Sequence, residues 1–204
     1  MYRETPPKEL PWETLKPSPP LVRLVESGKI PPGRALDIGC GLGIQSIYLA
    51  QEGFKVTGID ISETAIRQAK QRARRRRASV RFVVGNSFDL RFPSGSFSFI
   101  FDRGCFHHAP LQMRETYIRG IHRVLRPGGK YMLMAFSKRN NWEVQNEFSF
   151  KDIQKYFSDM FRIVSTEEVL HVQPDGWKVY MHCILMERLE KVNKGLPCPP
   201  LGDG

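Results

Sequence analysis

The stretch Ala35-Leu-Asp37-Ile-Gly39-Cys-Gly41-Leu-Gly43 decides the fold of this chain of 204 residues. It contains most of a short apolar run, 34–38, that is typical of a buried strand, and it leads into a helical pattern at 44–51. Glycines at a strand-to-helix turn let the backbone approach a ligand closely at the carboxyl edge of a parallel sheet. Their spacing, GxGxG, is one residue shorter than the nicotinamide-binding GxGxxG. The stretch therefore predicts a ligand site on the first turn of an α/β sheet.

A second acidic residue, Asp60, lies 23 positions after Asp37, at the end of a strand predicted over Phe54 to Ile59. An acidic side chain at this place in a nucleotide-binding sheet accepts hydrogen bonds from both ribose hydroxyls. Two plainer roles stay open: Asp60 could only cap the next helix, and Asp37 could be an ordinary turn residue. Together with the glycines, the two carboxylates favour a nucleoside-containing ligand.

Strand and helix patterns alternate along most of the chain. Ser62 is a good N-cap for a helix to about Arg77, and Ser149 with Asp152 predicts a capped helix through Phe157. A further helix is expected at 112–125, stopped by Pro127-Gly-Gly129, and the other strands at 80–84, 97–101, 130–136, 161–169 and 178–188. The last two have no crossover helix between them, so the last strand is expected to be antiparallel. The predicted fold class is α/β: a Rossmann-like, mostly parallel seven-stranded sheet with helices on both faces.

The chain is expected to form one domain, residues 34–190, flanked by an arm and a tail. Residues 1–33 are rich in proline and predict an arm with a short helix at 20–28, and residues 191–204 predict a disordered tail. The longest apolar run, 131–136, is far shorter than the ~20 residues of a membrane span. The four cysteines form no CxxC pair, which argues against a metal or redox dithiol site and favours a cytoplasmic location.

These motifs resemble those of the class I S-adenosylmethionine-dependent methyltransferases over about residues 10 to 188. The resemblance implies that the glycine turn holds the methionine part of the cofactor and that Asp60 binds its ribose. It places Asn86-Ser87, where the family usually has an Asp-small pair, and Phe88 at the adenine. The arm is implied to fold over the cofactor. The implied cofactor site comprises Trp12, Asp37, Gly39, Cys40, Gly41, Gly43, Asp60, Ile61, Asn86, Ser87, Phe88, Asp102 and Arg103.

The end of the fourth predicted strand, Asp102-Arg103-Gly104, is similar to that of the thiopurine, thiol and halide methyltransferase branch. The arm, with Pro11-Trp12-Glu13, is similar to the start of the same branch. The Asn-Pro-Pro-Tyr and Pro-Cys motifs of nucleic-acid methyltransferases are absent from the sequence. This branch implies a small-molecule methyl acceptor and places Trp12 over the sulfonium or the acceptor, where an aromatic face attracts a cation. A plainer role for Trp12, fastening the arm to the core, stays open.

The catalytic candidates are His107 and His108, which follow the strand edge that faces the cofactor methyl. Histidine is the natural base for a thiol or phenol near neutral pH, so one of the pair is expected to accept the acceptor's proton or to orient the acceptor. The alternative is a loop histidine bonded to backbone. Neighbouring side chains are expected to point apart, so no metal site is predicted. Cys105 could be a nucleophile, but a small packing role is favoured. The polar segment 137–145 could be an acceptor lid or a plain loop.

Five of the ten excess positive charges lie in one run, Arg72 to Arg77. A solvated helix end is the favoured interpretation, since cations stabilise a helix C-terminus. The competing one is a nucleic-acid methyltransferase that holds phosphates on this patch. We expect the patch at the sheet edge opposite the cofactor, which makes a nucleic-acid partner unlikely. A cofactor-binding protein without catalysis is a third alternative. The expected partner is a small-molecule acceptor, without a membrane, in a monomer or homodimer.

Overall fold

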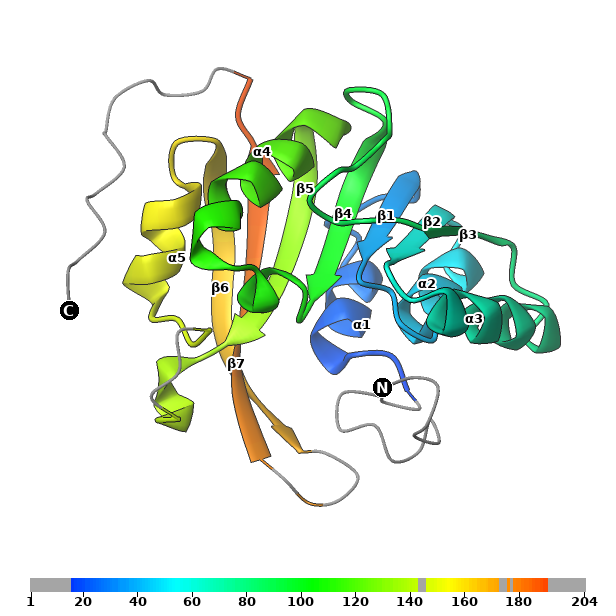
Figure 1. The fold of residues 1–204 in the computed structure, drawn as a ribbon, viewed down its shortest axis with the longest axis horizontal. Coiled ribbons are helices and arrows are strands. Elements are labelled where there is room, and N and C mark those ends of the chain that lie inside the picture. The colour runs from blue at the N-terminus through cyan, green and yellow to red at the C-terminus, as the bar shows by residue number, and fades with distance from the viewer. Residues whose placement is uncertain (1–15, 143–145, 173–175, 177, 191–204) are drawn as a thin grey trace.

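A computed structural model describes residues 16–142, 146–172, 176 and 178–190 (Figure 1). Its strands are β1 (Arg34–Ile38), β2 (Lys55–Asp60), β3 (Val80–Val84), β4 (Phe97–Arg103), β5 (Leu125–Phe136), β6 (Phe161–Val172) and β7 (Lys178–Arg188). Its α-helices are α1 (Pro19–Glu26), α2 (Ile44–Gln51), α3 (Glu63–Arg75), α4 (Arg114–Val124) and α5 (Phe150–Phe157). Single-turn helices cover Phe106–His108 (η2), Leu111–Met113 (η3) and Lys138–Asn140 (η4). No helix in these ranges has the length and apolar character needed to cross a membrane.

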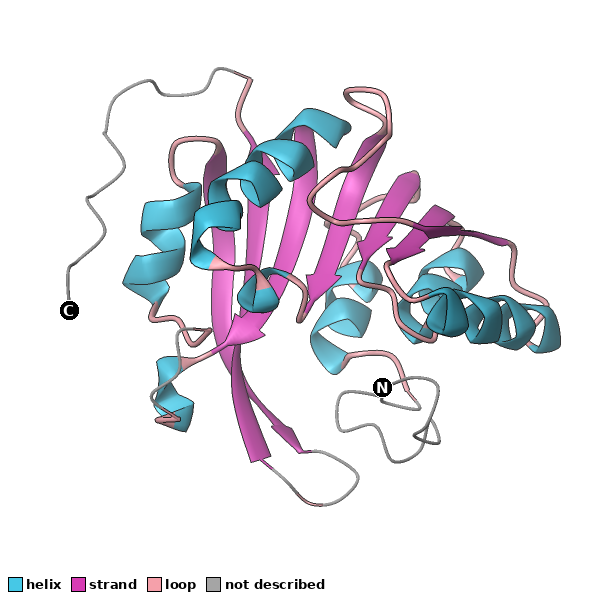
Figure 2. Cartoon of the chain, viewed as in Figure 1, coloured by secondary structure: helices cyan, strands magenta, loops and turns pink. Residues whose placement is uncertain are grey.

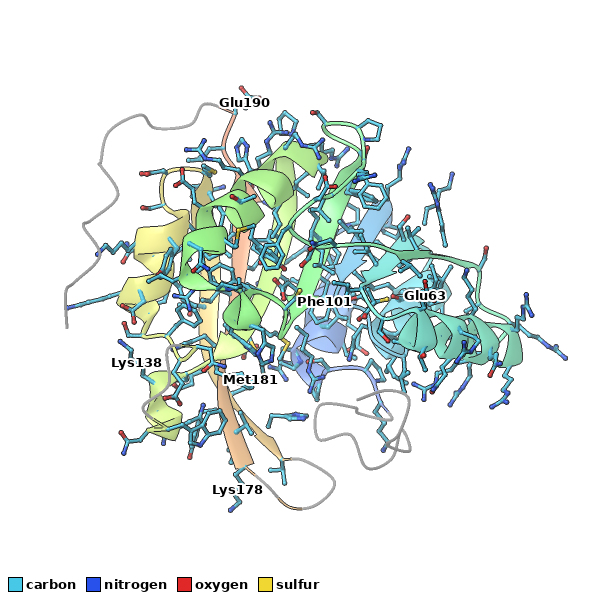
Figure 3. All side chains as sticks on the ribbon, in the orientation of Figure 1. Glu63, Phe101, Lys138, Lys178, Met181 and Glu190 are labelled. Atoms are coloured by element: carbon cyan, nitrogen blue, oxygen red, sulfur yellow. The ribbon has the colours of Figure 1, made fainter. Side chains whose placement is uncertain are left out.

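All seven strands form one sheet in the order β3-β2-β1-β4-β5-β7-β6 (Figure 2). Strands β1 to β5 pair in parallel, and β7 is antiparallel to both of its neighbours. In Figure 3, Lys178 marks the start of this last strand, and Glu190 lies two residues beyond its other end. The predicted fold class, including the antiparallel last strand, is confirmed.

The strand order reverses beside β1, which lies between β2 and β4. Asp37 of β1 pairs with Gly58 of β2 on one side and with Phe101 of β4 on the other. Ligands of open α/β sheets bind outside the carboxyl ends of the strands at such a reversal, because the loops there diverge. We therefore expect a ligand to bind at the carboxyl ends of β1, β2 and β4.

Helices cover both faces of the sheet. One face carries Leu36, Ile38, Ile100 and Leu133 against α4 and α5, which lie in front of the strands in Figure 1. The other face carries Phe99, Phe101, Met132 and Met134 against Leu21 of α1 and Leu49 of α2. Helix α3 joins α2 and β3 in a smaller third cluster around Phe82. Burial of these apolar faces is the main stabilising term of the fold.

Local capping agrees with the predicted helix starts. The Ser62 hydroxyl accepts a hydrogen bond from the Ala65 amide at the start of α3. Ser149 and Asp152 form a reciprocal capping box at the start of α5. Each bond satisfies a backbone N–H that has no partner inside its helix.

Several predicted boundaries move. Helix 112–125 is shorter at both ends, because η3 precedes it and the backbone becomes extended at Leu125. The Pro-Gly-Gly sequence that was expected to follow the helix is part of β5 instead. Strands β4 and β6 run on to Arg103 and Val172, since each keeps a hydrogen-bonded neighbour beyond its apolar stretch. The predicted tail, 191–204, lies outside the described residues, as does the arm up to residue 15.

Candidate functional site

The glycine turn between β1 and α2 is a backbone cradle. Gly39, Gly41 and Gly43 all have positive φ angles, of 65°, 51° and 77°. A Cβ atom on Gly43 would lie 2.7 Å from the Phe82 ring, and one on Gly39 would lie 3.1 Å from the Cys105 Cβ. Because residues with side chains rarely adopt such φ angles and space is lacking, the turn requires glycine. The turn brings its backbone to the carboxyl edge of the sheet with Gly39 exposed, while the Cys40 and Gly43 amides donate to the Ile59 and Cys40 carbonyls inside the protein.

Asp60 joins this turn to the start of α3. Its Oδ2 atom accepts a hydrogen bond from the Gly41 amide at 2.9 Å, and its Oδ1 atom accepts one from the Ser62 amide at 2.9 Å. A carboxylate offers about four acceptor positions, so about two remain for other donors. A ribose diol supplies two O–H donors. The bond to Ser62 also agrees with a capping role, so Asp60 fits both roles considered for it.

The residues predicted at the adenine, together with Ile61, lie close to Asp60 in the sequence or in the loop after β3. Ile61 is the most exposed large apolar side chain among the described residues, at 74%. The Gly85 amide donates to the Asp60 carbonyl at 3.0 Å, which brings 86–88 alongside. The Asn86 Oδ1 atom accepts from the Phe88 amide at 2.9 Å, so one of its two lone pairs stays available. The Phe88 ring packs edge-on against Tyr117. An exposed aliphatic side chain beside polar acceptors fits a nucleoside.

Asp37 is buried behind the turn rather than exposed in it. Its Oδ2 atom accepts a hydrogen bond of 2.5 Å from the Ser46 hydroxyl of α2. Burial raises the pKa of the Asp37 carboxyl to about 7. The side chain therefore holds the first turn of α2 against β1 and is not exposed to a ligand in the glycine turn.

Asp102 is the clearest correction to the predicted cofactor site. Its carboxylate is fully buried and accepts from the Tyr117 hydroxyl at 2.6 Å, the Tyr131 hydroxyl at 2.9 Å and the Cys105 and Phe106 amides. These four donors fill its acceptor positions. The side chain cannot bind a cofactor, and instead it fastens the loop after β4 to the core.

Arg103, the next residue, points to the opposite face of the sheet. One of its guanidinium nitrogens lies 3.2 Å from the His171 Nε2 atom of β6. Arg103 also contributes to the lowered pKa of His171, after burial. The predicted role of Arg103 at the cofactor has no test here and stays a prediction.

The two cysteines near the turn are packing residues. Cys40 is buried, and its pKa is raised well above the ordinary value, first by burial and then by the charge of Asp37. The same two causes, with Asp102 as the charge, raise the pKa of Cys105 to about 12. Only thiolates are good nucleophiles. The favoured packing role of Cys105 therefore agrees with the structure.

His107 and His108 form the turn η2 directly after β4. His107 is buried, with 2% exposure, and its Nδ1 atom accepts a hydrogen bond from the Phe136 amide of β5 at 3.2 Å. His108 is exposed. The two rings lie 4.4 Å apart, edge to face, so the expectation that they point apart is wrong. No cluster of three metal-ligating side chains is present among the described residues.

A cavity of about 220 Å³ opens beside this turn. It is lined by His107, His108, Ala109, Pro110, Leu111, Arg114 and Asn146. Its volume exceeds the about 150 Å³ of an enclosed cavity that binds benzene, but this cavity is open to solvent and its lining includes histidine, arginine and asparagine side chains. In the predicted lid, Trp142 is only half exposed because it packs against Phe136 with the ring centroids 5.1 Å apart.

Other residues at this edge carried no local signal in the sequence. The Ser18 amide, just before α1, donates to Gln45 of α2 at 2.9 Å, and its hydroxyl contacts the Met134 sulfur at 3.2 Å. Arg114 is buried among Phe106, Phe148 and Tyr156, and its guanidinium lies 4.8 Å from the centre of the Phe148 ring. Trp12, predicted to cover the site, lies outside the described residues.

Four residues of the arginine run, Arg74 to Arg77, lie at the amino-terminal edge of the sheet, whereas the Arg72 guanidinium lies 3.5 Å from the Leu42 carbonyl of the glycine turn. Helix α3 starts at the carboxyl end of β2, and its last turn, with Arg74 and Arg75, leads into the first residue of β3. Arg74 to Arg77 are exposed. Arg74 to Arg77 thus lie at the expected amino-terminal edge of the sheet, and their placement opposite a bound cofactor stays a prediction.

Comparison with known proteins agrees with this geometry. A family model described as a methyltransferase domain matches residues 35–129. A 2-heptyl-1-hydroxyquinolin-4(1H)-one methyltransferase of Mycobacteroides abscessus is 36% identical, over 67% of this chain and 62% of its own length. A probable thiol methyltransferase of Arabidopsis thaliana is 33% identical, over 62% and 56%. The chain thus spans about three fifths of these two relatives.

A shorter relative is matched almost completely. An uncharacterized methyltransferase of Schizosaccharomyces pombe is 32% identical, over 63% of this chain and 91% of its own length. Among solved structures, one from work on the conversion of a disulfide bond into a thioacetal group during echinomycin biosynthesis has a TM-score of 0.82. It is 26% identical, and the match covers 92% of this chain and 90% of that one.

Proposed function

We propose that this chain, which belongs to the S-adenosylmethionine-dependent methyltransferases, methylates a small molecule at a thiol or another soft atom. The observation that carries the proposal is a nucleoside-sized set of contacts at one sheet edge. Asp60 with open acceptor positions, the exposed Ile61 and the glycine turn lie there together. The cavity of about 220 Å³ begins at His107, two residues after Cys105, which packs close to Gly39 of the glycine turn.

The chain's own residues fit the cofactor in separate parts. Asp60 would accept the ribose hydroxyls, Ile61 and Asn86 would border the adenine, and the exposed Gly39 would let the methionine part of the cofactor approach the backbone. S-adenosylmethionine, when bound, supplies a methyl group activated by a sulfonium charge. For an in-line displacement the protein mainly has to align two reactants and exclude water. The loop that Asp102 fastens would border the acceptor.

Sulfur is the proposed acceptor atom for two reasons. A soft thiolate needs little chemical help beyond alignment. This suits a site in which two carboxylates, Asp37 and Asp102, are buried in structural roles and do not serve as bases. The probable thiol methyltransferase of Arabidopsis and the structure from the thioacetal work both concern sulfur. The Mycobacteroides relative concerns a hydroxyquinolinone, so ring-bearing acceptors belong in the test.

The test is release of S-adenosylhomocysteine from S-adenosylmethionine with small thiols, halide, phenols and amines, without any macromolecule. We expect release with thiols and its loss in Asp60→Ala, with Asp89→Ala as a control because Asp89 is an exposed residue paired with Arg91. If no small molecule gives release but RNA or DNA added in a second assay does, the nucleic-acid alternative is supported. Cofactor binding without release for any acceptor would support a non-catalytic protein.

A further inference from the structure

The imidazole of His107 is held by one specific hydrogen bond. Its ring lies nearly parallel to the Phe136 ring, at 15° and 3.7 Å between centres, and its Nδ1 atom receives the Phe136 amide proton. A backbone amide is only a donor, so Nδ1 must carry a lone pair. The neutral ring then has its single proton on Nε2. The fold thereby selects one tautomer.

The groups that face this ring keep it neutral. Arg103 of β4 and His108 of the same turn act on the charge of the ring, and Arg114 of α4 lines the same cavity. From β5, the Phe136 ring stacks on His107 and the Phe136 amide donates to Nδ1. Burial is the main cause that lowers the pKa of His107 well below its ordinary value, and His108 and Arg103 lower it further. With Nδ1 engaged and Nε2 already protonated, His107 has no free position that could take a proton from an acceptor.

The Nε2–H group points to the turn at the end of β4. An ideal Cβ atom on Gly104 would lie 3.5 Å from Nε2 and 3.4 Å from Cε1, and Gly104 has a φ of 91°. Cys105, the next residue, contacts Gly39 of the glycine turn. Among the described residues, none accepts a hydrogen bond from Nε2, although His107 lines the cavity. A hydrogen-bond donor without a partner among the described residues therefore lies beside Gly104 on a side chain that lines the cavity.

From this geometry we infer that His107 is a fixed hydrogen-bond donor for an acceptor that enters the site already ionised, and is not a general base. The inference rests on the proposed function and refines its substrate class: aromatic or other acidic thiols that are thiolates near neutral pH. The thiolate sulfur forms a bond to the methyl carbon as the bond from that carbon to the sulfonium sulfur breaks. The electron pair of that bond remains on the former sulfonium sulfur, and the acceptor's proton has already gone to solvent.

A pH series over aryl thiols of different acidity tests this. We expect kcat/KM of the native protein to rise with pH to a plateau, with the inflection following the pKa of each free thiol. If a base on the protein took the proton, kcat/KM would show an inflection at the same pH for every thiol, and that result would overturn the inference. His107→Leu should lower kcat/KM about ten- to a hundredfold, because a hydrogen bond to an ionised group is lost. His107→Gln, which keeps a donor, should recover part of the rate, and His108→Gln serves as the matched neighbour.

The tautomer is measured without turnover. Two-bond ¹H–¹⁵N spectra of the ¹⁵N-labelled native protein, assigned with the two histidine variants, should show His107 as the Nε2–H form from pH 5 to pH 9. An Nδ1–H form, or titration inside that range, would overturn the inference. Because these spectra need no acceptor, a chain that methylates nothing in the panel would contradict the proposed function alone.

Discussion

The Asp60 carboxylate and the Gly41 amide are joined by a hydrogen bond of 2.9 Å that spans two strands of the sheet. Through this bond Asp60, the proposed ribose acceptor, also holds the glycine turn, which is proposed to contact the methionine part of the cofactor. Any change in Asp60 therefore acts on both halves of the proposed cofactor site.

Replacing Asp60 separates these two contributions. Asp60→Ala should weaken S-adenosylhomocysteine binding by tenfold or more, about 1.4 kcal/mol, in calorimetric titration. Asp60→Asn should weaken it less, because one side-chain oxygen can still accept a hydrogen bond. The Asp89→Ala control should bind as the native chain does. Equal affinities for all three variants would remove Asp60 from the site.

The site residues differ in how well the sequence predicts them. Strands β1, β3 and β7 agree with their predicted bounds because short apolar runs with clear ends define them. The Asp37 and Asp60 positions follow from strand ends, which local patterns locate. The structural role of Asp102 could not be predicted from a local pattern, because its hydrogen-bond donors include the hydroxyls of Tyr117 and Tyr131 on other elements. The tautomer of His107 likewise depends on Phe136, which is 29 residues distant.

Tyr117→Phe tests the buried role of Asp102. Loss of one hydroxyl leaves a fully buried carboxylate with one donor fewer, so the free energy of unfolding should fall by about 1.5–3 kcal/mol. Chemical denaturation followed by circular dichroism measures this. Tyr48→Phe, on the half-exposed side of α2, is the matched control and should change stability by less than about 0.5 kcal/mol. If both variants are equally stable, the hydroxyl of Tyr117 is not needed by Asp102.

Gly43→Ala tests the cradle against backbone strain alone. Gly43 and Gly28 both have positive φ, of 77° and 68°, but only Gly43 has an atom within 4 Å of the added Cβ. Alanine at either position should cost about 1–2 kcal/mol through its backbone. At Gly43 the clash with Phe82 should add to this cost and lower cofactor affinity. The comparison uses unfolding midpoints and calorimetry, and an equal loss at both glycines would contradict crowding by Phe82.

Asp37 should make stability fall with rising pH. The unfolded chain loses this proton near pH 3.8, whereas the folded chain keeps it until about pH 7. Between these values the folded state binds more protons, so the free energy of unfolding decreases as pH rises, by at most about 1.4 kcal/mol per pH unit. Asp37→Asn should flatten this part of the profile in urea titrations. No change of slope in Asp37→Asn would show that the carboxyl is ionised in the folded chain.

For Asp152 the dependence of stability on pH has the opposite sign. Hydrogen bonds from Ser149 and the charge of Lys138 outweigh burial and lower the pKa of Asp152, so the stabilisation is lost toward acid pH. Asp152→Asn should therefore flatten the acid limb of the stability profile.

The arginine run should be separable from methyl transfer. Arg74, Arg75, Arg76 and Arg77 are exposed at the end of α3 that leads into the amino end of β3, whereas Asp60, Ile61 and the glycine turn lie at the carboxyl ends. On a solvated surface, charges separated by more than the Debye length, about 8 Å at physiological salt, are largely screened from each other. Changing all four arginines to glutamine should therefore leave S-adenosylhomocysteine affinity and thiol methylation within twofold of the native values. A large fall in methylation with an unchanged fold would mean that the run holds the acceptor. In that case, binding of single-stranded RNA or DNA should weaken steeply with salt in the native chain and be lost in the variant.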